Sequence, residues 1–221
     1  MSFKNKKILI TSGPTWVPID EMRVLSNRST GELGQILAQK MARSGARVTL
    51  LEGAVTRSLR LPSIKIIKFL FFEELLSQIK KELHKKYDIF IHAAAVSDYQ
   101  LNKPFRGKLP SQKKNLNLCL IPTPKIIQMV KRIDPGIFLV GFKLEPELNS
   151  ESMREKTKDL FQKARCNLVV ANRLKKGKYQ GLILDKNGNI FAKASSREKM
   201  AEELIKILEN KQYCCFNKIT L

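Results

Sequence analysis

Residues 7–14 read K-I-L-I-T-S-G-P, and this stretch decides how the rest of the chain is interpreted. The short apolar run at 7–11 ends at serine, glycine and proline, which is typical of a buried strand followed by a turn. Residues 32–44 then place apolar side chains at the helical period, and Gly45 is suited to ending a helix. This part of the chain therefore predicts a strand, a turn, a helix and, at 47–51, a second strand.

The same alternation of strands and helices continues to about residue 210. Further strands are expected at 64–69, 88–92, 137–142 and 167–171, with an extended segment at 116–121. Helices are expected at 73–86, at 124–132, at 150–165, and from the sequence S-S-R-E at 195–198 to about residue 210. Residues 180–185 and 189–193 flank Asn187-Gly188 and predict a hairpin. The order implies an α/β fold: a Rossmann-like, mostly parallel sheet with helices on both faces and a late β-hairpin.

Local signals also mark helix ends and one loop. Two S-x-x-E sequences, at 29–32 and 195–198, match the capping box that begins helices. Pro124 is expected in the first turn of its helix, a position that tolerates proline. Residues 102–114 are polar, basic and proline-bearing, so they predict an irregular loop of unusual length.

All elements are assigned to a single domain over residues 1–221, with a core at about 7–210 and a short C-terminal tail at 211–221. No apolar run approaches the roughly 18–20 residues that a membrane-spanning helix needs. The first ten residues lack the apolar segment and the small-residue cleavage site of a signal peptide. We therefore expect a cytoplasmic protein with no membrane partner.

The composition is strongly basic, with 41 Lys and Arg against 20 Asp and Glu and a formal net charge of +21. Either the whole composition is lysine-rich, or the charge attracts polyanions such as nucleotides or nucleic acid. Aromatic residues are only 7%, and no compact basic segment is present, so nucleic acid is not expected as a partner. Four cysteines without a C-x-x-C pair, and two histidines, do not match a zinc site and favour plain thiols.

Ligands of parallel sheets bind beyond the carboxyl ends of the strands, so the segments there are the candidate site. Residues 26–31 (S-N-R-S-T-G) lead into a helix N-terminus, which binds an anion or is an ordinary cap. Residues 93–99 (A-A-A-V-S-D-Y) admit a ligand or allow a tight crossing of sheet and helix. Phe142 would pack on a base or in the core. Lys108, beside a glycine, would reach a phosphate or remain a solvated loop lysine.

Two patterns of nucleotide-cofactor enzymes are not fulfilled. The turn after the first strand has one glycine, Gly13, where the dinucleotide fingerprint G-x-G-x-x-G needs three. Tyr99 and Lys103 match Y-x-x-x-K of short-chain dehydrogenases, but residues 102–104 (N-K-P) predict a loop instead of a shared helix face. An oxidoreductase is therefore the weaker alternative to a nucleotide-using enzyme of another class.

Seven short motifs, taken in order, resemble those of the phosphopantothenate–cysteine ligase family. They are T-S-G-P-T-x-x-x-I-D at 11–20, S-N-R-S-T-G at 26–31, A-A-V-S-D-Y at 94–99, G-K-L-P-S at 107–111, T-P-K-I-I at 123–127, G-F-K-L-E at 141–145 and V-V-A-N at 169–172. Each is weak alone, but seven in order with compatible spacing are specific. The resemblance runs from about residue 7 to residue 210. It is to the stand-alone form, without the flavin-binding decarboxylase domain fused to many bacterial members.

The resemblance implies a reaction of coenzyme A biosynthesis. The family joins 4′-phosphopantothenate to L-cysteine through an acyl-nucleotide, and it releases a nucleoside monophosphate and pyrophosphate. Bacterial members usually consume CTP and eukaryotic members ATP; we expect CTP before ATP here, with Mg²⁺ and without flavin. The family also suggests a homodimer whose sites the partner subunit completes, and a separate phosphopantothenoylcysteine decarboxylase in the pathway.

The resemblance also implies site residues where the motifs match. Catalytic roles fall to Asn27, which steadies the acyl-nucleotide, and to Lys108, on a mobile loop over the active site. The residues expected to contact phosphopantothenate are Asn27, Ala94, Ala95 and Asp98. The residues expected to contact the nucleotide are Gly13, Ala94, Asp98, Lys108, Pro124, Lys125, Ile126, Ile127, Phe142, Lys158 and Lys163. The residues that would bind the Mg²⁺ ion stay unassigned. Lys158 is one residue from the family position, and the charges of Lys113 and Lys114 depart from the family's loop pattern.

Overall fold

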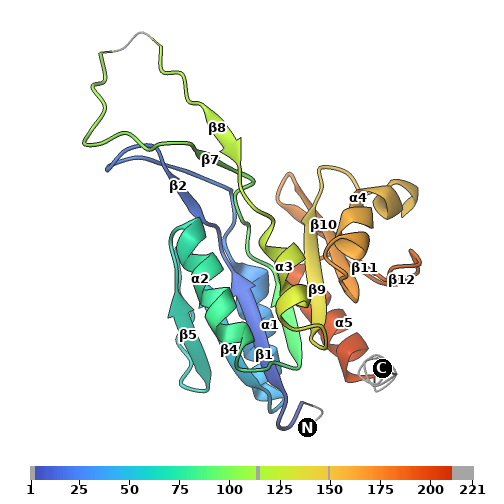
Figure 1. Ribbon diagram of the computed structural model, residues 1–221. Helices are drawn as coiled ribbons and strands as arrows, with labels where there is room; N and C mark the ends of the chain where they lie inside the picture. The colour runs from blue at the N-terminus through green and yellow to red at the C-terminus, as the bar shows by residue number, and fades with distance from the viewer. Residues whose placement is uncertain (1–2, 113–114, 149, 211–221) are drawn as a thin grey trace.

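The computed structural model describes residues 3–112, 115–148 and 150–210, and its centre is an eight-stranded sheet (Figure 1). The spatial order is β12-β11-β10-β9-β6-β1-β4-β5. The strands are β1 (Lys7–Ser12), β4 (Arg47–Glu52), β5 (Ile64–Lys68), β6 (Ile89–His92), β9 (Phe138–Leu144), β10 (Leu168–Lys175), β11 (Lys178–Leu184) and β12 (Ile190–Ala194). The six neighbouring strands β10, β9, β6, β1, β4 and β5 run parallel to one another. β11 and β12 add two antiparallel strands at the edge next to β10. The expected fold class is confirmed.

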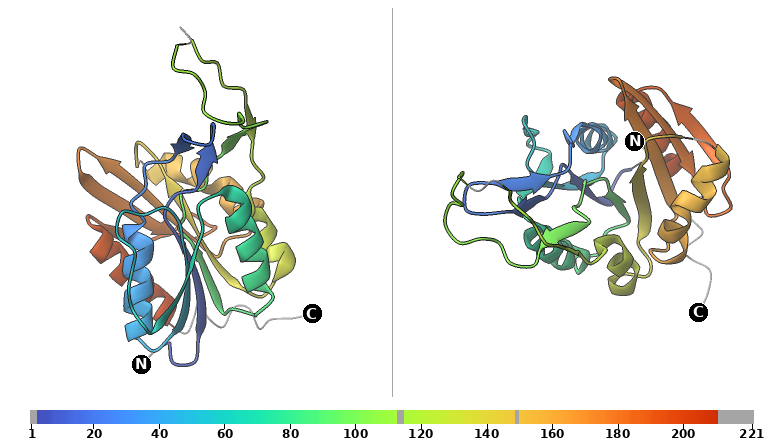
Figure 2. Two further views of the ribbon diagram at one scale, coloured as in Figure 1. Left: turned by 90° about the vertical axis from the view of Figure 1, so that its left-hand side faces the viewer. Right: turned by 90° about the horizontal axis from the view of Figure 1, so that it is seen from above.

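Helices cover both faces of the sheet (Figure 2). On one face lie α1 (Glu32–Arg43) and α5 (Arg197–Glu209), and on the other lie α2 (Phe72–Leu83), α3 (Ile126–Ile133) and α4 (Ser150–Gln162). Ile8 and Ile10 face the first layer, and Leu9 faces the second; none of the three is exposed. Because both faces are covered, β1 has no polar alternation and appears in the sequence as one apolar run.

Two small sheets project from the carboxyl edge of the main sheet as the arm, which comprises residues 16–26, 99–112 and 115–122 (Figure 1). In the arm, β2 (Trp16–Pro18) pairs with β3 (Val24–Ser26), and β7 (Tyr99–Leu101) pairs with β8 (Leu120–Pro122). Four apolar side chains are buried together in it: Val17, Ile19, Leu101 and Leu109. The irregular loop expected at 102–114 is confirmed for residues 102–112. β2, β3 and β7 are unexpected, because three-residue strands are too short to show a period.

Both expected capping boxes are wrong in detail. α1 begins after Gly31, which has a left-handed φ of 72° and, as the N-cap residue, supplies no side-chain hydrogen bond to the helix. The Ser12 hydroxyl donates to the Gly31 carbonyl at 2.6 Å, so a contact with β1 sets this start. α5 begins after Ser196, whose hydroxyl accepts the Lys199 N–H, one residue later than the S-x-x-E pattern indicates. Pro124 also precedes α3, whose N-cap is Lys125.

Some sequence features lie outside the described residues: Lys113, Lys114, the tail at 211–221 and, within the tail, Cys214 and Cys215. Of the cysteines in the described part of the chain, Cys119 is exposed, Cys166 is buried, and both are free thiols. No three His, Cys, Asp or Glu side chains within residues 3–112, 115–148 and 150–210 are grouped to hold a metal ion. No helix in the same ranges is long and apolar enough to cross a membrane.

Candidate active site

The carboxyl ends of β1 and β6 mark the point where the chain changes direction across the sheet. From β1 the chain continues to β4 and β5 on one side, and then crosses to β6, β9 and β10 on the other. Doubly wound sheets bind their ligands in the crevice at such a switch point. The residues that follow β6 are alanines 93–95, so their backbone is open to close approach.

A cleft of about 1220 Å³ opens at this switch point. Its walls come from the N-terminal end of α1, the segment after β6, the start of α3, the ends of β9 and β10, and α4. Eight of the expected site residues line it: Asn27, Ala94, Ala95, Asp98, Lys125, Ile127, Phe142 and Lys158. The fold therefore brings five of the seven sequence motifs into one cavity.

Asn27 connects two of these motifs. Its Nδ2 donates to the carbonyl oxygens of Ala95, at 3.3 Å, and Val96, at 3.1 Å. Since both partners are acceptors, the nitrogen end of the amide faces the segment after β6. The exposed side chain of Asn27 thus lies beside the alanine backbone, at the mouth of the cleft.

Buried hydrogen bonds hold the cleft floor. The Nδ1 atom of His92 is 2.9 Å from Thr11 Oγ1, and the same hydroxyl oxygen accepts the Ala94 N–H at 3.1 Å. Burial lowers the pKa of His92 to about 4, so the ring is neutral at neutral pH and its Nδ1 is free to accept from Thr11. The carbonyl of Gly13 accepts the Ala95 N–H at 2.9 Å. Gly13 supports the floor from outside and does not line the cleft.

One wall of the cleft is basic. Lys143 and Lys156 approach Glu145 at 3.4 and 2.9 Å, and Lys158 is paired with Glu155 at 3.5 Å. Burial acts to raise the pKa of Glu145, but hydrogen bonds from Lys156 and Lys143 outweigh it and lower the pKa. This carboxylate remains charged and holds two ammonium groups, one from the end of β9 and one from the middle of α4.

The other side of the entrance carries an ion pair. Lys125 Nζ lies 2.5 Å from Asp98 Oδ1, and both side chains line the cleft although each is more than half exposed. The pair therefore bridges the segment after β6 to the start of α3. A ligand that enters here meets either an ammonium or a carboxylate, depending on which partner it displaces.

The β10–β11 hairpin and the start of α5 contribute residues that sequence reasoning missed. Arg173, Tyr179 and Arg197 all line the cleft. Arg173 Nε donates to Gln180 Oε1 at 2.6 Å, and the Arg197 guanidinium lies over the Tyr179 ring at 5.6 Å and pairs with Glu32 at 3.2 Å. No local signal identifies these residues: the pairing of β10 with β11 brings Arg173 and Tyr179 to the cleft, and Arg197 lines it as the first residue of α5.

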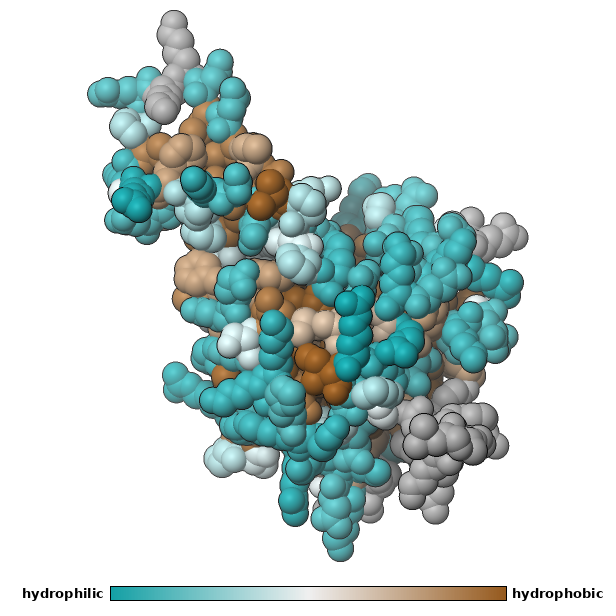
Figure 3. All heavy atoms as spheres, viewed as in Figure 1, coloured by the Kyte–Doolittle hydropathy of each residue, from teal (hydrophilic) through white to brown (hydrophobic). Residues whose placement is uncertain are grey.

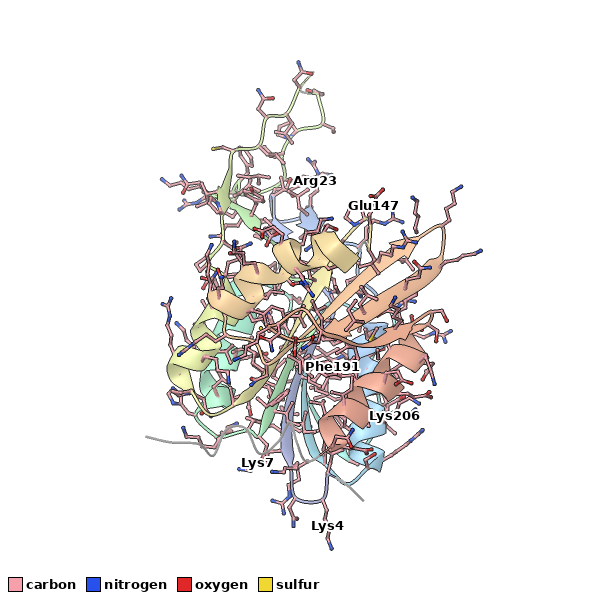
Figure 4. All side chains as sticks on the ribbon, turned by 90° about the vertical axis from the view of Figure 1, so that its right-hand side faces the viewer. Lys4, Lys7, Arg23, Glu147, Phe191 and Lys206 are labelled. Atoms are coloured by element: carbon pink, nitrogen blue, oxygen red, sulfur yellow. The ribbon has the colours of Figure 1, made fainter. Side chains whose placement is uncertain are left out.

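Several expected site residues lie elsewhere. Lys108 is exposed on the arm and does not line the cleft. Ile126 is only 3% exposed and belongs to the core, and Pro124 lies outside the cleft before α3. Lys163 does not line the cleft, but it pairs at 3.0 Å with Asp159, which does. Figure 4 shows Arg23 in the arm, at the end of the molecule opposite Lys4 and Lys7.

The end of β4 differs from that of a dinucleotide-binding sheet, where an acidic residue binds a ribose hydroxyl. Glu52 at this position is fully buried and accepts hydrogen bonds from Gln35, Ser58 and Lys68 and from the Leu59 N–H. Burial acts to raise its pKa, but these bonds, with Lys68 first, lower it. The carboxylate holds the loop after β4 and has no oxygen left for a sugar.

Residues 3–211 match the family described as the DNA/pantothenate metabolism flavoprotein C-terminal domain. The chain belongs to this family. The coenzyme A biosynthesis bifunctional protein CoaBC of Thermococcus kodakarensis is 41% identical over 177 residues, which are 79% of this chain and 43% of that protein. A solved flavoprotein of the same description from Streptococcus pneumoniae has a TM-score of 0.83 at 27% identity and covers 93% of this chain and 99% of its own.

A further structure shares the fold of this flavoprotein C-terminal domain. It is a Cab2 variant in complex with phosphopantothenate-cysteine, with a TM-score of 0.76, 21% identity, and coverage of 95% of this chain and 87% of that one. The chain spans about half the length of the curated bifunctional relatives that it matches. The family indicated by the seven motifs is confirmed at the level of this domain.

Proposed function

We propose that this protein joins 4′-phosphopantothenate to L-cysteine and consumes a nucleoside triphosphate in doing so. The single observation that carries the proposal is the meeting of five matching motifs in one cleft at the switch point of the sheet. Membership of the flavoprotein C-terminal family, and relatives that act in coenzyme A biosynthesis, support it. The cleft has room for a nucleotide and a second phosphorylated substrate side by side.

The proposed reaction has two steps. The phosphopantothenate carboxylate attacks the α-phosphorus, a P–O bond breaks, and pyrophosphate leaves with the bonding electrons. The cysteine amine then attacks the acyl carbon, the C–O bond to the nucleotide breaks, the monophosphate leaves, and the amine loses its proton. Both steps concentrate negative charge, so groups that offset it lower the barrier.

The proposed roles follow from the walls of the cleft. Asn27 offers an uncharged N–H to the acyl oxygen when that oxygen replaces the carbonyl of Ala95 or Val96. Lys156 and Lys158, at the basic wall, attract the triphosphate, and Arg173 adds a guanidinium whose protein partner is neutral. Phe142 and Ile127 supply an apolar surface for the base. Lys163 would contact the triphosphate only after its ion pair with Asp159 breaks.

Magnesium would travel with the triphosphate, because Mg²⁺ retains waters and binds phosphate oxygens with only one or two carboxylates. Asp98 fits this role: its carboxylate lies at the cleft entrance and is held by a single lysine. The ion would neutralise phosphate charge. We propose CTP before ATP as the nucleotide on the family resemblance alone.

We also propose a homodimer. Lys108 is exposed on an arm outside the cleft, so in the dimer it would serve the site through approach of the whole arm or from the partner subunit. Exposed apolar side chains gather on the arm: Met22, Val24, Leu25, Tyr99, Phe105, Leu116 and Leu120. Figure 3 shows the corresponding hydrophobic surface. Such a patch on a projecting element is suited to an isologous contact.

One assay tests the function. The purified protein is incubated with 4′-phosphopantothenate, cysteine, Mg²⁺ and either CTP or ATP, and pyrophosphate is measured. Release that requires both phosphopantothenate and cysteine supports the proposal, and the two nucleotides are compared in the same experiment. Pyrophosphate release independent of either co-substrate contradicts it. Binding of NADH or NADPH would favour the oxidoreductase alternative, against which the occupied carboxylate of Glu52 argues.

A further inference from the structure

The backbone on each side of Lys108 is held by hydrogen bonds. The Gly107 N–H donates to Glu21 Oε1 at 3.0 Å, and the Gly107 carbonyl accepts the Glu21 N–H at 3.4 Å. The Leu109 N–H donates to Asp20 Oδ2 at 3.0 Å, and the Leu109 carbonyl accepts from Arg23 at 2.8 Å. The two neighbours of Lys108 are thus tied to the turn between β2 and β3, while the lysine side chain is exposed.

Asp20 is the centre of this arrangement. Its side chain is fully covered, and its Oδ1 accepts the N–H groups of Met22 and Arg23 at 2.9 and 2.8 Å. Its Oδ2, besides the Leu109 N–H, lies 3.6 Å from the Arg23 guanidinium. The Leu109 hydrogen bond, above all, lowers the pKa of Asp20 despite an opposing effect of burial. An ionised carboxylate only accepts, and both of its oxygens are occupied here.

The apolar part of the arm reinforces the same contact. Leu109 is 8% exposed and packs with Val17, Ile19 and Leu101 in the small core of the arm. Gly107, in contrast, has a left-handed φ of 66° and no atom within 4 Å of the position of a Cβ. Packing therefore does not restrain the residue before Lys108, and hydrogen bonds to the β2–β3 turn do.

We propose that Asp20 is a positioning residue that presents Lys108 from the arm in one orientation. It acts through the backbone: with Arg23 it holds both peptide groups of Leu109, and its turn places Glu21 on Gly107. Lys108 consequently moves with the arm as a unit and does not swing on a free loop. This inference rests on the proposed ligase function for its kinetic consequence only; the clamp itself is a property of the arm.

Asp20→Asn is the test variant, because an amide nitrogen in place of one oxygen cannot accept the N–H groups there and the charge facing Arg23 is lost. If Asp20 acts through Lys108, kcat falls at least tenfold while KM for the nucleotide changes less than threefold. Lys108→Gln alone lowers kcat by orders of magnitude with an unchanged Tm. The double variant is no slower than Lys108→Gln. Asp185→Asn is the matched control, since Asp185 also accepts the N–H groups of a turn, at Asn187 and Asn189, away from the arm.

A second measurement needs no ligase activity. Trypsin cleavage after Arg106 and Lys108, followed by mass spectrometry, is expected to be at least fivefold faster in Asp20→Asn and unchanged in Asp185→Asn. If Asp20→Asn does not fold, Glu21→Ala, which removes only the side-chain contact to Gly107, is expected to give a smaller acceleration. Wild-type cleavage rates, or losses of kcat that multiply in the double variant, overturn the proposal. A wild-type protein without ligase activity refutes the function, while the cleavage rates still decide the clamp.

Discussion

The side chain of Asn27 is held in place by hydrogen bonds at the cleft, where we propose that it acts. Its amide nitrogen donates to two carbonyl groups of the segment after β6, so its position is set by the alanine backbone that also forms the cleft floor. In the proposed reaction, an acyl oxygen that replaces one of these carbonyls would find the donor already in place. Preorganised donors of this kind lower barriers because they do not have to reorient during the reaction.

Asn27→Asp is expected to lower kcat by about 10²–10³-fold, the scale of losing one oxyanion donor. The carboxylate loses the donor and also faces the carbonyl oxygens of Ala95 and Val96 and the phosphate charge. Nucleotide binding, measured by calorimetry, is expected to survive. Asn187→Asp, on the exposed β11–β12 turn, is the control for an added charge. Near-normal turnover in Asn27→Asp would remove this residue from the site.

His92 predicts a pH dependence of stability. Its pKa is 6.5 in the unfolded chain and about 4 when buried, so between these values the unfolded chain binds a proton that the native state does not. The free energy of unfolding therefore falls as the pH drops from 6.5 to 4, by up to about 3 kcal/mol from this group. Urea titrations of the wild type and His92→Gln across this range test it. Carboxyl groups with lowered pKa values also make the free energy of unfolding depend on pH, but they do so equally in both proteins. If the free energy of unfolding changes with pH by the same amount in the wild type and in His92→Gln, the prediction is contradicted.

At the scale of elements, the start of α1 depends on a residue without a side chain. Gly31 has a left-handed φ, and a Cβ there would lie 2.6 Å from Val55 Cγ1 and 2.8 Å from Ser12 Oγ. The helix end is therefore pressed against β1 and the loop after β4. This close approach brings the backbone of residues 27–31 to the cleft, so the N-terminal end of α1 forms part of its wall.

Gly31→Ala is expected to destabilise the protein by about 2–4 kcal/mol, since left-handed backbone strain adds to overpacking. Gly107→Ala is the matched control: it has a similar φ of 66° but open space around the Cβ position. Strain alone should cost it about 1 kcal/mol. Urea denaturation measures both, and equal losses for the two variants would show that the contacts of Gly31 with β1 are unimportant.

At the scale of the whole molecule, the protein has two parts: the main sheet with its helices, which forms the cleft, and the projecting arm, which contains Lys108. The apolar side chains exposed on the arm lie apart from the core that the helices cover (Figures 1 and 3). Water is excluded from such side chains only if another surface covers them. The dimer proposed above therefore predicts that association and activity are lost together.

Leu25→Glu is expected to convert the protein to a monomer and to reduce turnover, because a charge replaces an apolar contact on the arm. Phe191→Glu, on the edge strand β12 and away from the arm, is the matched control, because Phe191 and Leu25 are equally exposed, at 38% each. Sedimentation at the assay concentration measures the mass of each. A fully active wild-type monomer would contradict the proposal.

The sequence by itself predicted the alternation of strands and helices, the parallel sheet and the family. Strand and helix periods depend on neighbours within a few residues, and K-I-L-I-T-S at 7–12 is apolar because β1 is covered on both faces. The motifs around Asn27, Asp98 and Phe142 were also found in the sequence, since the segments after parallel strands converge at one edge.

Tertiary structure alone decided which residues line the cleft and which do not. Arg173 reaches it on β10, which pairs antiparallel with β11, and Arg197 reaches it at the start of α5, where it pairs with Glu32 of α1; nothing in their own neighbourhood indicates these contacts. The N-cap of α1 is Gly31 and not Ser29 as the sequence pattern predicted, because the hydroxyl of Ser12, which is distant in the chain, donates to the Gly31 carbonyl. Lys108 lies on the arm, where Asp20 holds its neighbour. Each of these positions is set by contacts between residues distant in sequence, whose energies no local pattern of side chains contains.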